Sequence, residues 1–145
     1  MESSGAPRDT ARAMSKETVE ILRRLLEAFN DRDLDTIVEM CDPQVEWHTP
    51  PDIPDPAVYY GRDEARKNVQ DLLQVFDDLR VEPERFEESG DEVVGLYRLL
   101  GHGSGSGVPI EIKVGVACTF SDGKATRVRF WNDWDMALEA VGLKE

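Results

Sequence analysis

The spacing of apolar residues changes along this chain, from a helical repeat in the first half to a strand repeat in the second. Apolar residues recur every three or four positions in residues 19–29, 34–41 and 65–76. From Leu79 onward they alternate with polar residues, most regularly in residues 108–120. These two periods predict amphipathic helices followed by antiparallel strands. Helices followed by strands indicate an α+β fold in which helices cover one face of a sheet.

Capping and helix-breaking residues set the expected limits of the helices. The first helix is expected to begin near Ser15 and to end at about Asn30, and Asp33 is expected to cap a second helix. Pro43 ends that second helix because the residue before a proline is pushed out of the helical region. A third helix is expected after Gly61, beyond a proline-rich surface crossing.

Turn residues divide the rest of the chain into strands. The expected strands cover residues 44–49, 79–88, 92–101, 108–120 and 125–132, and a short tail helix covers 133–141. Pro83 places the second of these strands at a sheet edge, because proline cannot donate a hydrogen bond to a neighbouring strand. The glycine-rich residues 101–107 join two strands, so they predict a hairpin tip and not a phosphate-binding loop.

The composition restricts the class of partner. The chain has 145 residues with 17 basic and 30 acidic side chains, a net charge of -13, which predicts no binding to nucleic acid or to anionic membranes. Residues 1–14 are small and polar, and we expect a disordered arm there, followed by a single domain over residues 15–145. Neither a signal peptide nor a membrane span is visible, which predicts a cytoplasmic protein. Cys41 and Cys118 are expected to be buried free thiols.

Three strings suggest a family: EAFNDRDLDTIVEMCDPQVEW, YYGRDEARKNVQDLL and TFSDGKATRVRFWNDWDMALEAVGL. They resemble the SnoaL-like and ketosteroid-isomerase-like branch of the nuclear transport factor two-like superfamily, over residues 16–143. The resemblance implies a conical, curved antiparallel sheet, the cystatin-like barrel, covered by three N-terminal helices and followed by a short C-terminal helix. Such a cone encloses an apolar pocket. Members include polyketide cyclases, isomerases, epoxide hydrolases, dehydratases and proteins without known chemistry, so the fold alone does not supply the function.

The catalytic groups of the ketosteroid isomerases are missing at the matching positions. Trp47 stands in the place of their carboxylate base, and an indole cannot accept a proton at neutral pH. Leu25 replaces their tyrosine donor, and Val116 replaces their protonated carboxylic acid. Isomerisation by that mechanism is therefore not expected.

Two residues are candidates for acid or base chemistry. Asp133 follows the last strand, where SnoaL-like cyclases often carry an acidic residue, and Trp131 and Trp134 beside it could raise the pKa of its carboxyl. The alternative is that Asn132 or Asp133 caps the tail helix. His48 is the second candidate, although a histidine in the opposite strand phase from Trp47 is more often a surface or rim residue.

The candidate pocket residues are mostly apolar. The predicted set is Trp47, Tyr60, Phe76, Tyr97, Val116, Val128, Phe130 and Asn132. Core packing is the alternative for Trp47, a plug beneath the surface crossing for Tyr60, and packing outside the cavity for Tyr97. The only histidines, His48 and His102, lack a metal-binding spacing, so no metal or cofactor is expected.

The convex face of the sheet is a candidate interface. Arg127, Arg129 and Trp131, with Glu111 and Lys113 on the neighbouring strand, are expected there, and in this superfamily that face commonly packs against a second copy. We therefore predict a homodimer. Three functions remain open: an enzyme of the cyclase, hydratase or hydrolase type using Asp133, a non-catalytic protein that binds a small hydrophobic molecule, and an interaction module acting through the sheet face.

Overall fold

The computed structural model describes residues 5–143, with side chains described from residue 16 onward. The elements are α1 (Gly5–Asn30), α2 (Leu34–Glu39), β1 (Cys41–His48), β2 (Val58–Tyr60), α3 (Arg62–Val75), β3 (Phe76–Ser89), β4 (Glu92–Gly103), β5 (Pro109–Ser121), β6 (Lys124–Trp131) and α4 (Trp134–Ala140). The strands form one curved sheet in the order β2-β1-β6-β5-β4-β3. All neighbours are antiparallel except β1 and β6, which run parallel. The predicted α+β fold is confirmed.

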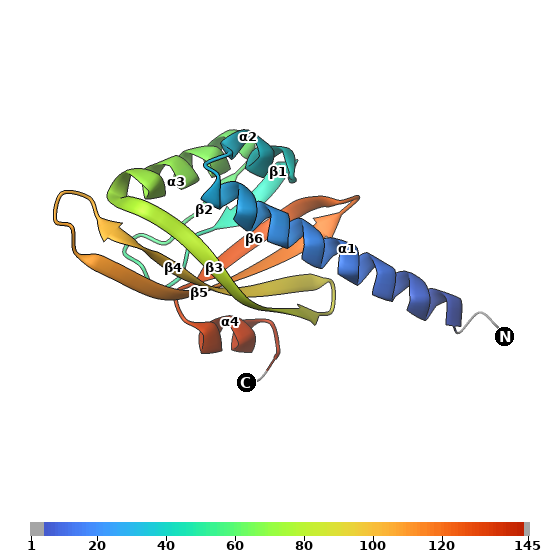
Figure 1. Ribbon diagram of the computed structural model, residues 1–145. Helices are drawn as coiled ribbons and strands as arrows, with labels where there is room; N and C mark the ends of the chain where they lie inside the picture. The colour runs from blue at the N-terminus through green and yellow to red at the C-terminus, as the bar shows by residue number, and fades with distance from the viewer. Residues whose placement is uncertain (1–4, 144–145) are drawn as a thin grey trace.

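Helices lie on both faces of the sheet (Figure 1). The helices α1, α2 and α3 cover the concave face, and α4 lies against the convex face. A large apolar cluster fills the concave side, and a smaller one, which includes Leu96, Ala117, Trp131 and Leu138, joins α4 to the convex side. None of the helices within residues 5–143 is long and apolar enough to cross a membrane.

The first helix is longer than the sequence suggested. It begins at Gly5, so residues 5–14, which were expected to be disordered, are helical, while residues 1–4 of that expected arm lie outside the described residues. Alanine and arginine are strong helix formers, and Pro7 falls in the first turn, where its missing N–H costs no hydrogen bond.

Two strands begin earlier than expected, and both are irregular near a proline or a bend. Strand β1 starts at Cys41 and includes Pro43, and its pairing with β6 shifts register between Cys41 and Glu46 because proline has no N–H to donate. Strand β3 starts at Phe76 and shifts register after Pro83. Its position at the sheet edge confirms the prediction made from Pro83.

The end of α1 is tied to the edge strand. The Asn30 side chain donates to the Val81 carbonyl (3.0 Å) and accepts from the Val81 amide (2.7 Å). Leu22 of the same helix packs so close to Gly95 that a Cβ there would lie 3.1 Å from Leu22 Cδ2. These contacts fix α1 across the open side of the curved sheet.

Candidate functional site

A cavity of about 430 Å³ lies between the concave face of the sheet and the helices. Its apolar lining comes from α1, α2 and α3 on one side and from β1, β3, β4, β5 and β6 on the other. The lining includes Leu22, Leu25, Leu26, Phe29, Val69, Leu72, Trp47, Leu99, Ile112, Val114, Val116, Val128 and Phe130. The alternation in residues 108–120 produces this lining, because every second side chain of β5 points to the concave face.

Trp47 is held rigidly at one side of the cavity. Its indole Nε1 donates to Asn68 Oδ1 on α3 (3.0 Å), and its ring centroid lies 5.2 Å from that of Phe130, with the two planes tilted by 52°. Only 6% of the residue is exposed. A buried indole whose N–H is paired supplies a large apolar surface for packing against a ligand.

Few polar groups reach the cavity, and most of them already have partners. Asn68 accepts from Trp47, and Thr49 Oγ1 both donates to and accepts from the backbone of Ala57. Asp71 is the only carboxylate among the described lining residues, and it is exposed at the cavity mouth. Those lining residues include no lysine, arginine or histidine.

Tyr97 and Cys118 are the buried titratable groups of the lining. Tyr97 is 6% exposed and Cys118 is fully buried. Burial raises the pKa of the Tyr97 hydroxyl far above its usual value, and the nearby Cys118 adds to the rise. Burial likewise raises the pKa of the Cys118 thiol. Both groups are therefore uncharged at neutral pH, and Cys118 lacks the thiolate character of a nucleophile.

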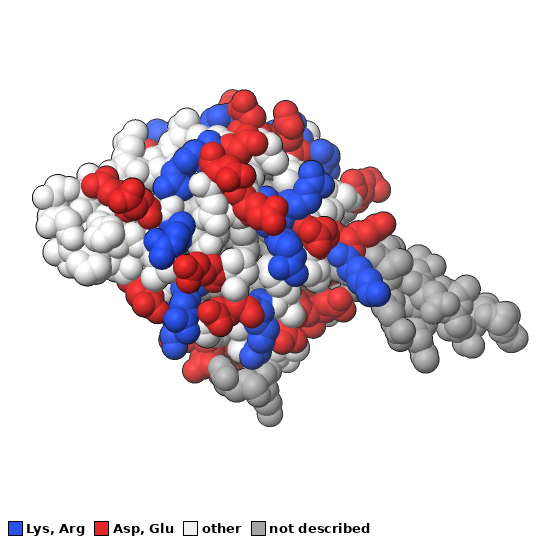
Figure 2. Space-filling view, viewed as in Figure 1, with Lys and Arg blue, Asp and Glu red and all other residues white. Residues whose placement is uncertain are grey.

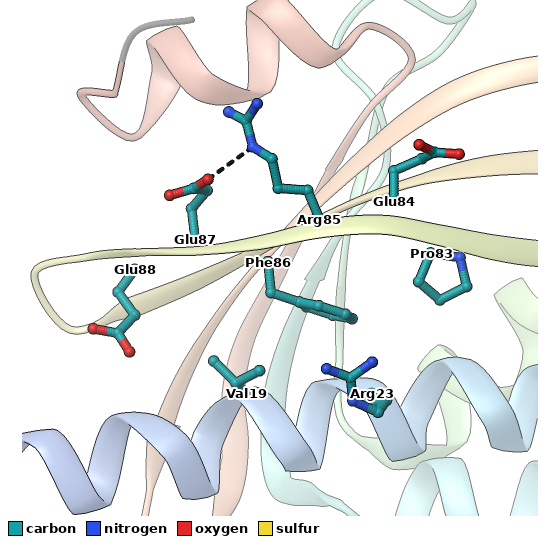
Figure 3. Close-up of a pocket in the computed structure, with 8 residues that line it drawn as sticks. All are labelled: Val19, Arg23, Pro83, Glu84, Arg85, Phe86, Glu87 and Glu88. Atoms are coloured by element: carbon teal, nitrogen blue, oxygen red, sulfur yellow. Dashed lines mark ion pairs between the residues drawn. The ribbon is translucent and has the colours of Figure 1, made fainter.

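A second hollow of about 690 Å³ lies outside the cone, between α1 and β3 (Figure 3). Phe86 points toward α1, where the Arg23 guanidinium carbon lies 4.6 Å from its ring centroid. Arg85 and Glu87 point to the other side of β3 and pair with each other at 2.7 Å. Acidic and basic side chains are interspersed over this face of the molecule (Figure 2). The hollow is an open, charge-paired surface and not an enclosed site.

The convex face is more covered than the sequence suggested. Trp131 is 7% exposed because it packs in the cluster beneath α4, so it is not available to an interface. Arg129 Nη2 donates to both carboxylate oxygens of Glu92 (2.7 and 2.9 Å), and Arg127 lies 3.5 Å from the same carboxylate. Within one chain, Trp131 is therefore covered and the two arginines pair with Glu92 through Nη2, while their buried Nε atoms have no hydrogen-bond partner among the described residues.

Comparison with known proteins agrees with this architecture. The family model of the SnoaL-like domain matches residues 22–128. The chain belongs to the SnoaL-like family. The sequence matches none of the curated proteins, but many solved structures share the SnoaL-like fold of this chain.

Three of these structures show how completely the fold is shared. A candidate SnoaL-like polyketide cyclase from Jannaschia sp. CCS1 is 22% identical, with a TM-score of 0.73, over 90% of this chain and 94% of that one. An NTF2-like protein of unknown function from Burkholderia pseudomallei K96243 is also 22% identical, with a TM-score of 0.71, over 87% and 98%. TerC, co-crystallised with polyporic acid, is 25% identical, with a TM-score of 0.71, over 86% and 97%.

Most residues predicted for the pocket of this SnoaL-like chain line the cavity. These are Trp47, Phe76, Tyr97, Val116, Val128, Phe130 and Asn132. Tyr60 does not: it lies in β2, outside the cavity, and is 64% exposed. Leu25, Trp47 and Val116, which match the isomerase catalytic positions, all line the cavity and place apolar surface there.

The two candidate catalytic residues lie elsewhere. Asp133 is exposed and caps α4, where its Oδ1 accepts from the Met136 amide at 2.9 Å. It comes one residue after Asn132, which lines the cavity, and the chain leaves the sheet at that point to start α4. His48 Nε2 lies 3.2 Å from Glu46 Oε1, in the strand phase opposite to Trp47. The geometry brings neither group to the cavity.

The sequence reading missed Asn68 as a partner of Trp47. Its signal is present, because Asn68 lies between Ala65 and Leu72 in the apolar stripe of the third helix, at helical spacings from both. The described residues contain no group of three His, Cys, Asp or Glu side chains that could hold a metal ion.

Proposed function

We propose that this SnoaL-like protein binds a small, uncharged, largely apolar molecule in its cone without acid or base catalysis by Asp133 or His48. The supporting observation is the lining: apolar side chains from helices and strands, one exposed carboxylate at the mouth, and no cationic side chain among the described lining residues. The volume of about 430 Å³ lies in the range of small-molecule sites, about 300–1,000 Å³. An anionic ligand would lose its hydration there without gaining an opposite charge, and the one carboxylate of the described lining residues, which could pair with a cation, is exposed to water at the mouth.

The similar structures support a ligand-holding role without defining the ligand. TerC was co-crystallised with polyporic acid. The Jannaschia protein carries a cyclase description, but at 22% identity it shares the fold with this chain and nothing more. Catalysis needs an acid, base or nucleophile within reach of the bound molecule, and Asp133 and His48 lie outside the cavity. Binding is therefore the function that the geometry favours.

The predicted homodimer remains a proposal and rests on a smaller surface. With Trp131 covered by α4, the part of the convex face left for a second copy includes Arg98, Glu111 and Lys113. Analytical ultracentrifugation tests this directly. A species of twice the chain mass at micromolar concentration is expected, and a monomer would remove the proposal.

The binding function is tested by blocking the cavity from α3. Leu72 is half-buried and lines the cavity, whereas Gln74 is exposed on the same helix. Leu72→Trp should fill part of the cavity, and Gln74→Trp adds the same indole outside it. We expect the purified wild-type protein and Gln74→Trp to bind the uncharged fluorophore N-phenylnaphthylamine, and Leu72→Trp to bind at least about tenfold more weakly. Equal binding by all three proteins would place the fluorophore elsewhere and contradict the proposal.

A further inference from the structure

Tyr97 brings a single hydroxyl into the apolar interior of the cone. It lies in the middle of β4, paired with Val114 on β5 and with Pro83 on β3. Its neighbours on the same face of β4 are Gly95 and Leu99. The residue is 6% exposed and lines the cavity, so its side chain is surrounded by the core on all sides but one.

The hydroxyl of Tyr97 has no hydrogen-bond partner among the residues that the structure describes. By contrast, the indole N–H of Trp47 in the cavity is paired with Asn68, and that of Trp134 on the convex side is paired with the carbonyls of Tyr97 and Val114. Buried tyrosine hydroxyls nearly always find a partner. The open side of this hydroxyl faces the cavity, so the partner must come from the cavity contents.

The chemistry of the site restricts that partner. Because burial raises the pKa of Tyr97, its hydroxyl keeps its proton and acts as a neutral donor. A carboxylate or phosphate in the ligand would accept a hydrogen bond from this hydroxyl, but no cation among the described residues lines the cavity to compensate the negative charge of such a group. A ketone-type carbonyl or an ether oxygen accepts a hydrogen bond without carrying a charge.

We propose that Tyr97 is the polar anchor of the cavity, and that the ligand is an uncharged, mostly apolar molecule that carries an accepting oxygen and binds with this oxygen toward the Tyr97 hydroxyl. This inference rests on the proposed binding function and adds the ligand's polar group and orientation. Tyr97 is thereby a specificity-determining residue.

The test compares two rigid tricyclic molecules, fluorenone and fluorene, which differ by one carbonyl oxygen. Each is titrated against the N-phenylnaphthylamine complex of the wild type, of Tyr97→Phe and of Tyr60→Phe. Tyr60→Phe is the matched control because it removes the same hydroxyl from a residue that is 64% exposed. We expect the wild type and Tyr60→Phe to prefer fluorenone by about fivefold, which is the value of one ordinary hydrogen bond. Tyr97→Phe should bind both molecules equally, with its fluorene affinity within about twofold of wild type.

The outcomes separate this inference from the proposed function. If fluorene and fluorenone bind the wild type equally, the cavity binds apolar molecules but the hydroxyl is satisfied by water alone, and the anchor is overturned. If the preference persists in Tyr97→Phe, another lining group such as Asn132 supplies the hydrogen bond, which also overturns it. If the wild type does not bind the fluorophore at all, the proposed binding function fails as well. If it binds the fluorophore and neither tricyclic molecule displaces it, the anchor alone is overturned. We expect Tyr97→Phe to fold normally because the phenyl ring retains the shape of the tyrosine ring. Thermal unfolding of the variant checks this.

Discussion

The two faces of the sheet are both buried, yet they are packed in different ways. Gly115 and Val116 are neighbours on β5 and point to opposite faces. A Cβ at Gly115 would lie 2.3 Å from the Ala137 Cβ of α4, so the convex side has no room for even a methyl group. Val116 is only 2% exposed, but it borders a cavity of about 430 Å³. Low exposure is therefore compatible with a solid interior on one face and a hollow one on the other.

The polar groups of the two faces also have different surroundings. On the convex face, Glu92 receives two arginines, and the Trp134 indole donates to two carbonyls. On the concave face, the Tyr97 hydroxyl is left without a partner among the described residues. Four polar atoms of the convex face are nevertheless buried without a hydrogen-bond partner among the described residues: the Nε atoms of Arg98, Arg127 and Arg129 and the Thr119 hydroxyl. What distinguishes the concave face is the free space of the cavity beside its unpaired donor. This contrast supports a ligand site in the cone.

The largest expected effect on the free energy of unfolding is found by comparing two variants, each of which adds one carbon to one face of β5. Gly115→Ala should lower the free energy of unfolding by about 3 kcal/mol, because α4 must move to admit the new methyl group. Val116→Ile adds one carbon toward the cavity and should change the free energy of unfolding by less than about 0.5 kcal/mol. Urea denaturation of the two variants measures the difference. Equal destabilisation by both would mean that the cone is packed as tightly as the convex side.

Alkaline pH tests whether the part of the core around Cys41, at the start of β1, is shielded from water. Cys41 is fully buried there, and burial raises the pKa of its thiol from about 9.0 to about 11, against the opposing effect of Arg62 and Lys124. The folded protein thus keeps a proton that the unfolded chain releases. The stabilisation is fully present below pH 9 and is lost as the pH rises toward 11, by about 2 kcal/mol.

The control for this pH effect is Cys41→Ala, which keeps every other titrating group. The free energy of unfolding, measured by urea denaturation between pH 8 and 11, should fall more steeply in the wild type than in the variant. Parallel profiles would show that the Cys41 thiol ionises as freely in the folded protein as in the unfolded chain, and that water reaches it.

The ion pairs of the convex face should contribute a smaller amount. Glu92→Gln removes the carboxylate charge that Arg129 and Arg127 share, and since the Glu92 side chain is only 11% exposed we expect a loss of about 1 kcal/mol. Glu82→Gln is the control, because its pair with Arg80 is about half exposed and should be worth less than about 0.3 kcal/mol. Thermal unfolding at low salt compares them, and equal losses would contradict a special role for Glu92.

The smallest expected change in stability is that of Tyr97→Phe without ligand. The substitution removes a hydroxyl that makes no hydrogen bond to the described residues, so the free energy of unfolding should stay within about 0.5 kcal/mol of wild type or rise. Chemical denaturation measures it. A loss above about 1 kcal/mol would reveal a hydrogen bond to the Tyr97 hydroxyl inside the ligand-free protein and would contradict its role as a free donor.

Much of the fold could be predicted from the sequence because its apolar periods are regular. The alternation around Val116 identified the strand and its inward face, and Pro83 identified the edge strand. The position of α4 could not be predicted in this way, since Gly115 and Ala137 approach only in the folded chain. As a result, Trp131 was expected at an interface and is instead covered by the chain's own helix.

Most residues that line the cavity could be predicted from the sequence, but the positions and partners of its polar groups could not. Inward-facing positions follow from strand phase, which is why Val128, Phe130 and Asn132 line the cavity. Asp133 lies beyond the end of the strand, so strand alternation does not predict its direction. Its carboxylate instead caps the N-terminus of α4. Whether the Tyr97 hydroxyl has a hydrogen-bond partner depends on residues that are distant in the sequence, so it could not be predicted from a local sequence pattern.

The most direct test of the ligand-binding cone is a methyl NMR titration with fluorenone. Val116 and Val128 are 2% exposed and line the cavity, whereas Val94 is fully buried in the convex cluster of the same sheet. We predict saturable shifts of the Val116 and Val128 methyl signals at a stoichiometry of one, with the Val94 methyl signals nearly unchanged. Shifts confined to Val94 or to the exposed Val58, or no saturable shift of any methyl signal, would contradict the account.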